Sequence, residues 1–246
     1  MFQRTTAISK IQKIEEPIKV IQGSTGAGKT VGILSILIDK AQRGNQGTIS
    51  VVSESMPHLR RGAIKDFLSI MQQHHYYKDD SWNKTNLYYT FETGTVIEFF
   101  SADTPDKVHG PRRNILFVNE ANHISYDIYT QLELRTEGDI YIDFNPTQSF
   151  WAHTELKNYK LIILTYLDNE GYPEASRIRL EAHKDNKAFW RVYGLGLIGE
   201  LEESIYKDWK IIDEVPHEAT LERRWLDFGY TVDPTAIGDV YKYNGG

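Results

Sequence analysis

The chain has 246 residues, 40% of them hydrophobic and 25% charged, and these ordinary globular values predict one packed domain, or one domain plus a fragment of another. Its formal net charge of −6 argues against a general binder of polyanions, so any affinity for nucleic acid should be local and sensitive to salt. The absence of cysteine excludes disulfides and thiolate metal sites. No apolar run approaches the ~20 residues of a membrane span, which predicts a soluble, cytosolic protein.

The predicted elements alternate between strands and helices along the chain. In chain order they are a strand at Ile18–Ile21, a helix at Val31–Ala41, a strand at Thr48–Val52, a helix at His58–Gln73, a hairpin of Leu87–Phe91 and Thr95–Phe100 with Gly94 at its turn, strands at Ile115–Val118, Ile140–Phe144 and Leu161–Tyr166, and helices at Pro173–Asp185 and Lys187–Leu195. This alternation predicts the α/β class with a mainly parallel sheet that is covered by helices on both faces.

The composition changes after this series. The stretch Gly199–Glu218 is acidic and contains Pro216, so it is predicted to be a linker or lid. Arg224–Phe228 then reads as the opening strand of a new structure. We therefore expect three segments, residues 1–198, 199–218 and 219–246.

The loop after the first predicted strand matches the phosphate-loop pattern G-x-x-x-x-G-K-[ST] without deviation. Its backbone N–H groups and the helix that follows are expected to bind phosphates. Lys29 should reach the β- and γ-phosphates of ATP, and Thr30 should bind Mg²⁺. The alternative, a glycine-rich turn that matches by chance, does not explain the strand before it and the helix after it. The expected ATP-binding residues are Gly23, Ser24, Thr25, Gly26, Ala27, Gly28, Lys29 and Thr30.

A polar pair, Asn119 and Glu120, follows the predicted strand Ile115–Val118. In P-loop ATPases such a strand ends in an acid that holds magnesium, and the next glutamate activates water. Glu120 is therefore predicted to be the general base. Asn119 stands in the acid's place and is expected to bind Mg²⁺ through a water, so Asn119→Asp should strengthen magnesium binding.

The next predicted strand ends at Asp143–Pro146. Because the carboxyl ends of parallel strands line the ligand crevice, the Asn145 amide is expected to sense the γ-phosphate. A plain Asn-Pro turn is the alternative. We place the Asp143 carboxylate a turn away from the phosphate and expect Asp143→Asn to have a smaller effect than Glu120→Gln.

Several of these segments together resemble the large terminase subunit of tailed bacteriophages, over nearly the whole chain. Gly23–Thr30 looks like its Walker A motif, and Leu116–Glu120 looks like its Walker B motif with the catalytic glutamate. Asp143–Thr147 is similar to the coupling motif of that family. Tyr166–Asn169 and Val192–Gly196 resemble two further family passages, which are more specific than a phosphate loop.

The resemblance implies an additional-strand, RecA-like P-loop NTPase fold, followed by an RNase H-like nuclease. It also implies an ATP- and Mg²⁺-dependent motor that moves double-stranded DNA into a procapsid in the host cell cytoplasm. The implied partners are the portal, the small terminase subunit and, during packaging, further copies of the chain in a ring, with a monomer in isolation. Asp227 falls on the first metal-binding acid of the nuclease. We expect no nuclease activity, because the remaining chain is too short for that domain.

One departure from the family concerns the arginine that stabilises the transition state. Many members carry it inside the phosphate loop, where this chain has Thr25. The arginine must then come from a neighbouring ring subunit or from elsewhere in the chain. The candidates in the chain are Arg60, Arg61, Arg112 and Arg113.

Two other functions remain open at this point. The first is a helicase-like ATPase stimulated by nucleic acid, which would unwind a forked duplex. The second is an assembly scaffold that binds nucleotide with little hydrolysis, which Asn119 would favour if it weakens magnesium binding. A phosphate-release assay separates that scaffold from an ATPase.

Overall fold

The computed structural model describes residues 4–103, 108, 110–199, 212–228 and 235–243. The chain divides into two compact units, Met1–Glu202 and Glu203–Gly246, and each is described by itself. Most of the predicted linker Gly199–Glu218 lies outside the described residues. Among the residues that are described, no helix combines the length and the apolar character needed to cross a membrane.

The first unit is built on an eight-stranded sheet in the order β3-β4-β5-β2-β6-β7-β1-β8. Six strands are parallel, whereas β3 and β4 form an antiparallel edge next to β5. In chain order the strands are β1 (Ile18–Gly23), β2 (Thr48–Ser53), β3 (Trp82–Asn83), β4 (Tyr88–Thr90), β5 (Val96–Ser101), β6 (Ile115–Val118), β7 (Ile140–Phe144) and β8 (Leu161–Leu164). Since β7 lies between β1 and β6, the additional-strand arrangement and the parallel α/β class are confirmed.

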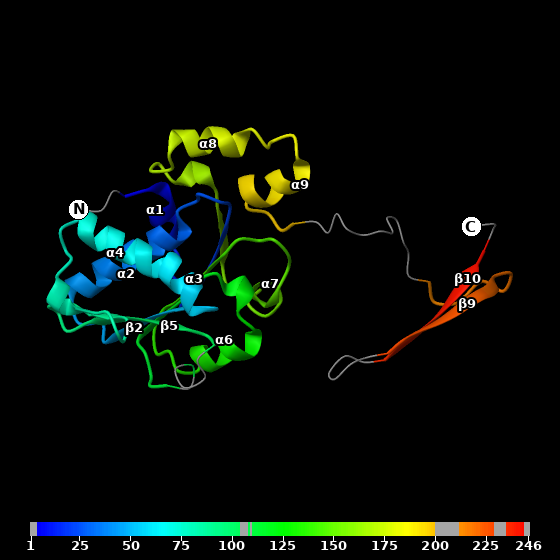
Figure 1. Cartoon of the computed structure of the whole chain (residues 1–246), viewed down its shortest axis with the longest axis horizontal. Helices are drawn as coiled ribbons and strands as arrows, with labels where there is room; N and C mark the ends of the chain where they lie inside the picture. Colours follow the sequence, from blue (N-terminus) through cyan, green and yellow to red (C-terminus); the bar gives the residue numbers. More distant parts are fainter. Residues whose placement is uncertain (1–3, 104–107, 109, 200–211, 229–234, 244–246) are drawn as a thin grey trace. The chain divides into compact units, whose positions relative to one another are not determined.

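Helices cover both faces of this sheet (Figure 1). Successive residues of a strand point to opposite faces, so in β2 Ile49 and Val51 join one core while Val52 joins the other. The first core packs beneath α1 (Thr6–Gln12), α2 (Lys29–Arg43) and α4 (Ala63–Gln73), and the second beneath α6 (Tyr126–Glu133) and α7 (Trp151–Thr154). The described residues also form the α-helices α3 (Met56–Arg61), α8 (Glu174–Glu181) and α9 (Lys187–Phe189), a π-helical turn at Trp190–Gly194, and 3-10 turns at Asp79–Ser81, Ala121–His123 and Tyr166–Asp168.

Several helices differ from the sequence prediction, including the short α7, which was not predicted. The single helix expected at His58–Gln73 is two helices, because the chain breaks at Gly62, whose N–H closes α3 on the His58 carbonyl. Helices α1 and α6 were not predicted. Each begins at a side-chain cap that the sequence contains, Thr5 for α1 and Ser125 for α6.

At the amino-terminal end of β7, Asp139 pairs with two lysines, through Oδ1 to Lys19 Nζ at 2.8 Å and through Oδ2 to Lys40 Nζ at 2.7 Å. Burial by itself would raise the pKa of Asp139, but the hydrogen bonds and charges of both lysines outweigh it and lower that pKa. The Lys19 side chain is only 7% exposed, so it depends on this counter-ion.

We expect Asp139→Asn to lower the free energy of unfolding by about 1–3 kcal/mol, the usual cost of leaving a buried polar group unsatisfied. A lowered pKa in the folded state means that the carboxylate stabilises the fold above its unfolded pKa, about 3.9, and loses this effect as the pH falls further. The gap between wild type and variant should therefore close below about pH 4. Urea unfolding at several pH values measures it.

The matched control is Asp39→Asn. Asp39 pairs with Arg43 within α2, and the Arg43 side chain is 78% exposed. An exposed pair of this kind contributes roughly 0–1 kcal/mol. Equal stability of the Asp139 and Asp39 variants would contradict the role given to Asp139.

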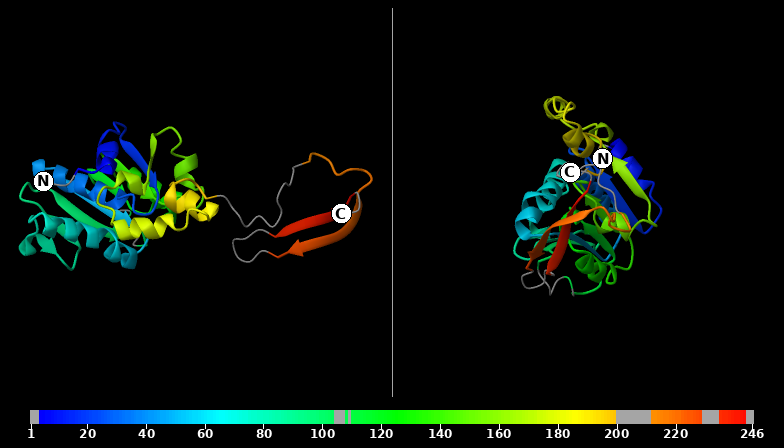
Figure 2. Two further views of the ribbon diagram at one scale, coloured as in Figure 1. Left: turned by 90° about the horizontal axis from the view of Figure 1, so that it is seen from above. Right: turned by 90° about the vertical axis from the view of Figure 1, so that its right-hand side faces the viewer.

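The second unit contains an antiparallel hairpin of β9 (Thr220–Asp227) and β10 (Ala236–Lys242) (Figure 2). Arg224 on β9 forms an ion pair with Asp239 on β10, with 2.6 Å between Nε and Oδ1. Asp227 ends β9, in agreement with the strand predicted there.

Candidate active site

The predicted residues of the nucleotide site follow β1, β6 and β7, at the end of the sheet where the carboxyl ends of these parallel strands lie. The loop after β1 turns sharply through Gly26 and Gly28, whose φ angles of 73° and 72° lie in the left-handed region that glycine adopts without strain. A Cβ atom on Gly26 would also stand 2.3 Å from the Tyr172 ring. The loop then enters α2 at Lys29, so its N–H groups and the helix amino terminus form an anion-binding cradle.

Lys29 is buried in this cradle with all three ammonium donors satisfied. Its Nζ donates to the carbonyl oxygens of Gly23 and Ser24, each at 3.0 Å, and to Asn145 Oδ1 at 2.6 Å. Burial lowers the pKa of Lys29 to about 8, although the charges of Asp143 and Glu120 raise it in part. Asn145 on the chain after β7 therefore lies directly beside the loop lysine.

Asp143 lies at the centre of the site and contacts the phosphate loop, so the expectation that its carboxylate stands a turn away from the phosphate is wrong. Its Oδ2 accepts a hydrogen bond from Thr30 Oγ1 at 2.7 Å. Its Oδ1 accepts from Asn119 Nδ2 at 3.0 Å and from the Glu120 N–H at 2.8 Å. Burial raises the pKa of Asp143, whereas the Lys29 charge and these hydrogen bonds lower it in part. The prediction was wrong because β7 lies next to β1, which spacing along the chain does not reveal.

Glu120 follows β6 in a left-handed conformation, with φ 56° and ψ 52°, which is uncommon outside glycine. Its backbone N–H is fixed on Asp143, so its side chain leaves the sheet edge. The Oε2 atom lies 2.9 Å from Nδ1 of His58 on α3, and both side chains are 50% exposed. Glu120 is therefore within the site and open to solvent, as a residue that activates water must be.

Segments after β8 hold the outside of the loop, and no role was predicted for them. Asn169 Nδ2 donates to the Gly26 carbonyl at 2.8 Å, and Gln22 Nε2 donates to the Gly196 carbonyl at 2.6 Å. Gly196 has φ 66°, and a Cβ atom there would stand 2.8 Å from the Ser24 nitrogen. The passages Tyr166–Asn169 and Val192–Gly196, noted in the sequence for their resemblance, thus form the wall of the phosphate loop.

The backbones of the four candidate arginines lie at opposite ends of the sheet. Arg113 precedes β6 and is buried over the Phe100 ring, and Arg112 pairs with Glu137 at 3.7 Å. The Arg113 backbone precedes β6, whereas its guanidinium extends to Phe100, whose backbone is level with Val118 at the carboxyl end of β6. The role of Arg112 or Arg113 as the arginine within one chain stays a prediction.

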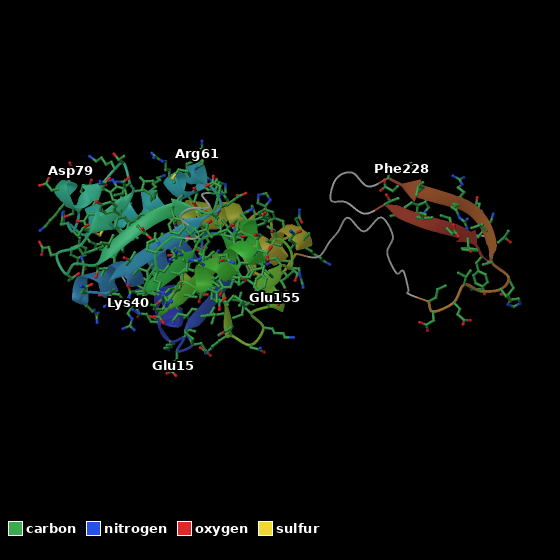
Figure 3. The ribbon with its side chains drawn as sticks, turned by 90° about the horizontal axis from the view of Figure 1, so that it is seen from below. Glu15, Lys40, Arg61, Asp79, Glu155 and Phe228 are labelled. Carbon is green, nitrogen blue, oxygen red and sulfur yellow. The ribbon has the colours of Figure 1, made fainter. Side chains whose placement is uncertain are left out.

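Arg60 and Arg61 lie instead on α3, the helix that carries His58. Both are exposed, and Figure 3 labels Arg61 at the surface of the first unit. The other outlying site residue, Asp227, belongs to the second unit.

Comparison with known proteins agrees with the fold. Residues 15–197 match the family model described as phage terminase large subunit. The large terminase of a thermophilic bacteriophage has 20% identity and a TM-score of 0.67, covering 99% of this chain and 66% of its own. The ADP complex of that terminase has 19% identity and a TM-score of 0.66, covering 99% of this chain and 66% of its own. The large terminase ATPase domain of Thermus phage P74-26 has 12% identity and a TM-score of 0.58, over 80% of this chain and 94% of that domain.

At these identities the solved structures establish the fold alone. The chain spans 66% of the length of the first of them. No curated protein matches the chain in sequence.

Proposed function

Because the chain belongs to the family of phage terminase large subunits, we propose that it is the ATPase motor that drives double-stranded DNA into a procapsid. One observation carries the proposal: at the carboxyl ends of β1, β6 and β7, the phosphate-loop lysine contacts Asn145, and Asp143 binds both the Thr30 hydroxyl and the backbone N–H of Glu120. Together with an arginine, that set provides the parts that phosphoryl transfer to water requires.

The chain's residues divide the work as follows. The loop N–H groups and Lys29 bind the β- and γ-phosphates of ATP and hold the γ-phosphorus in line with a water. Glu120 orients that water and accepts its proton. Asn145, whose Oδ1 accepts from Lys29 Nζ at 2.6 Å, is the group that loses or gains a partner when the γ-phosphate leaves. This contact makes it the coupling residue between ATP state and movement of the chain after β7.

Magnesium suits the Thr30 hydroxyl and the Asp143 carboxylate beside it, since Mg²⁺ prefers oxygen and is commonly shared between protein and substrate phosphates. In the described part of the chain, no three His, Cys, Asp or Glu side chains form a metal site of their own. The ion would therefore arrive with the nucleotide, where it neutralises charge on the phosphates.

The arginine that completes the site comes either from a neighbouring copy in the packaging ring or from one of the candidates in this chain, Arg60, Arg61, Arg112 or Arg113. Residues 219–246 are the start of the nuclease domain, with Asp227 as its first metal-binding acid. The partners of the chain are double-stranded DNA, the portal and the small terminase subunit, in the cytoplasm of the infected host.

The test is turnover measured by phosphate release, with and without DNA and procapsids. We expect slow hydrolysis by the isolated chain that rises with protein concentration or on adding procapsids, since an arginine supplied in trans is worth about 10³–10⁵ in rate. DNA that becomes resistant to DNase in the presence of procapsids and ATP demonstrates packaging.

Other outcomes identify the alternatives. Unwinding of a forked duplex would favour a helicase-like ATPase. Nucleotide binding without phosphate release under every condition would favour an assembly scaffold. A fast rate that does not depend on protein concentration would contradict the arginine in trans.

A further inference from the structure

At the site, the neighbouring strands β6 and β7 carry an amide and an acid side by side. The amide stands where P-loop ATPases usually have the acid. On β6 the position after the strand is the amide Asn119, although an acid is expected there in a P-loop ATPase. On β7 the acid is Asp143, which is only 1% exposed. The two side chains touch, with 3.0 Å between Asn119 Nδ2 and Asp143 Oδ1.

Asp143 makes the contacts expected of the carboxylate that lies next to the magnesium ion. Thr30, the loop residue that offers its hydroxyl to the ion, hydrogen-bonds Asp143 Oδ2 at 2.7 Å. Within the described residues, no other carboxylate is hydrogen-bonded to Thr30. Donors reach the buried Asp143 carboxyl group on both oxygens, from Thr30 at Oδ2 and from Asn119 and the Glu120 N–H at Oδ1, so its burial is compensated by hydrogen bonds.

Asn119 is suited to hold that carboxylate and not to replace it. Its Nδ2 donates both to Asp143 Oδ1 at 3.0 Å and to Thr30 Oγ1 at 3.3 Å. A carboxylate at this position could donate neither bond and would place a second negative charge against the first. The amide is therefore the partner that a buried acid on β7 requires.

We infer that acid and amide have exchanged strands in this protein: Asp143 of β7 supplies the carboxylate on the magnesium side of the nucleotide, and Asn119 of β6 orients it. The inference rests on the proposed ATP-binding function and assigns its metal-side residue. It reverses the expectation drawn from the sequence, since Asn119→Asp alone should impair the site and Asp143→Asn should damage it severely.

The exchange is tested with four proteins: wild type, Asn119→Asp, Asp143→Asn, and the double variant that swaps the two residues. The readouts are the affinity for a fluorescent ATP analogue with Mg²⁺ and with EDTA, the binding of Mn²⁺ beside a non-hydrolysable analogue by electron paramagnetic resonance, and thermal unfolding without metal. None of these depends on turnover.

We expect Asp143→Asn to lose Mn²⁺ affinity by at least about tenfold, because loss of even an outer partner of a metal ligand costs about 10- to 100-fold. Asn119→Asp should unfold at a lower temperature without metal, because two carboxylates then share one buried site. The double variant keeps one acid and one amide in contact, and should recover most of the metal affinity that Asp143→Asn loses. Asp127→Asn, the same change at an exposed position of α6, should behave as wild type.

Two results would overturn the exchange while leaving the ATPase proposal intact. One is an Asp143→Asn protein that binds Mn²⁺ as wild type does. The other is a double variant that binds Mn²⁺ no better than Asp143→Asn. A wild-type protein whose nucleotide affinity is the same with Mg²⁺ and with EDTA would overturn the exchange together with the proposed function.

Discussion

Glu120→Gln is expected to bind ATP with near wild-type affinity while its turnover falls by about 10²–10⁴, the usual value of a positioned general base. Glutamine has the same size, and the backbone N–H at position 120 keeps its 2.8 Å bond to Asp143, so the phosphate loop and Thr30 are undisturbed. The side chain can still accept a hydrogen bond from His58, but it cannot accept the proton of the attacking water. A binding curve with a fluorescent nucleotide and a phosphate-release rate measure the two effects separately.

The control for this change is Glu137→Gln, which makes the same substitution at the other end of the sheet. Glu137 is exposed and pairs with Arg112 at 3.7 Å. It should keep wild-type binding and turnover. If Glu120→Gln hydrolyses ATP as fast as this control, Glu120 is not the base and the assignment of β6 as the Walker B strand is lost with it.

Lys29→Ala is expected to lose both binding and turnover. The ammonium group is the only part of the loop that carries a full positive charge, and a charge-assisted hydrogen bond is worth about 1.5–3 kcal/mol, or about 10- to 100-fold in affinity. The same cation opposes the negative charge of buried Asp143, so its removal also raises the pKa of that acid. Isothermal titration with ATP gives the affinity, and phosphate release gives the rate.

Lys29→Met separates the lost charge from the lost volume. Methionine fills the space of the lysine stem, so the fold should unfold at a higher temperature than Lys29→Ala does, whereas ATP affinity should fall equally in both. Lys65→Met, on the exposed side of α4, controls for the change of residue type. A Lys29→Met protein that binds ATP like the Lys65 variant would show that another cation holds the phosphates.

The side chain of Glu120 contacts the helix that also carries two of the candidate arginines. Its carboxylate lies against His58 of α3, and the same helix carries Arg60 and Arg61. A movement of α3 would change both the direction of the base and the position of two exposed cations. The contact itself adds little stability, because both side chains are 50% exposed.

Local sequence patterns were sufficient for the six parallel strands, the hairpin turn and the loop. The six parallel strands are short apolar runs, the hairpin turn is marked by Gly94, and the phosphate loop from Gly23 to Thr30 is a contiguous pattern whose backbone angles only glycine adopts easily. Each of these features depends on residues that are near one another in the chain. The proposed nucleotide-binding loop and the proposed general base were therefore predicted from sequence, together with the family resemblance.

The order of the strands was decided by tertiary structure. Because β7 is inserted between β1 and β6, Asp143 meets Thr30 from 113 residues away and Asn119 from 24 residues away. The direction of β6 likewise puts the backbone of Arg113 at the end of the sheet opposite Glu120. Hydrogen-bond partners across a parallel sheet are set by which strands are neighbours, and no spacing in the sequence encodes that choice. For this reason the sequence predicted that a phosphate loop and a glutamate share one site, whereas only the folded sheet determined that Asp143 stands between Thr30 and the backbone of Glu120.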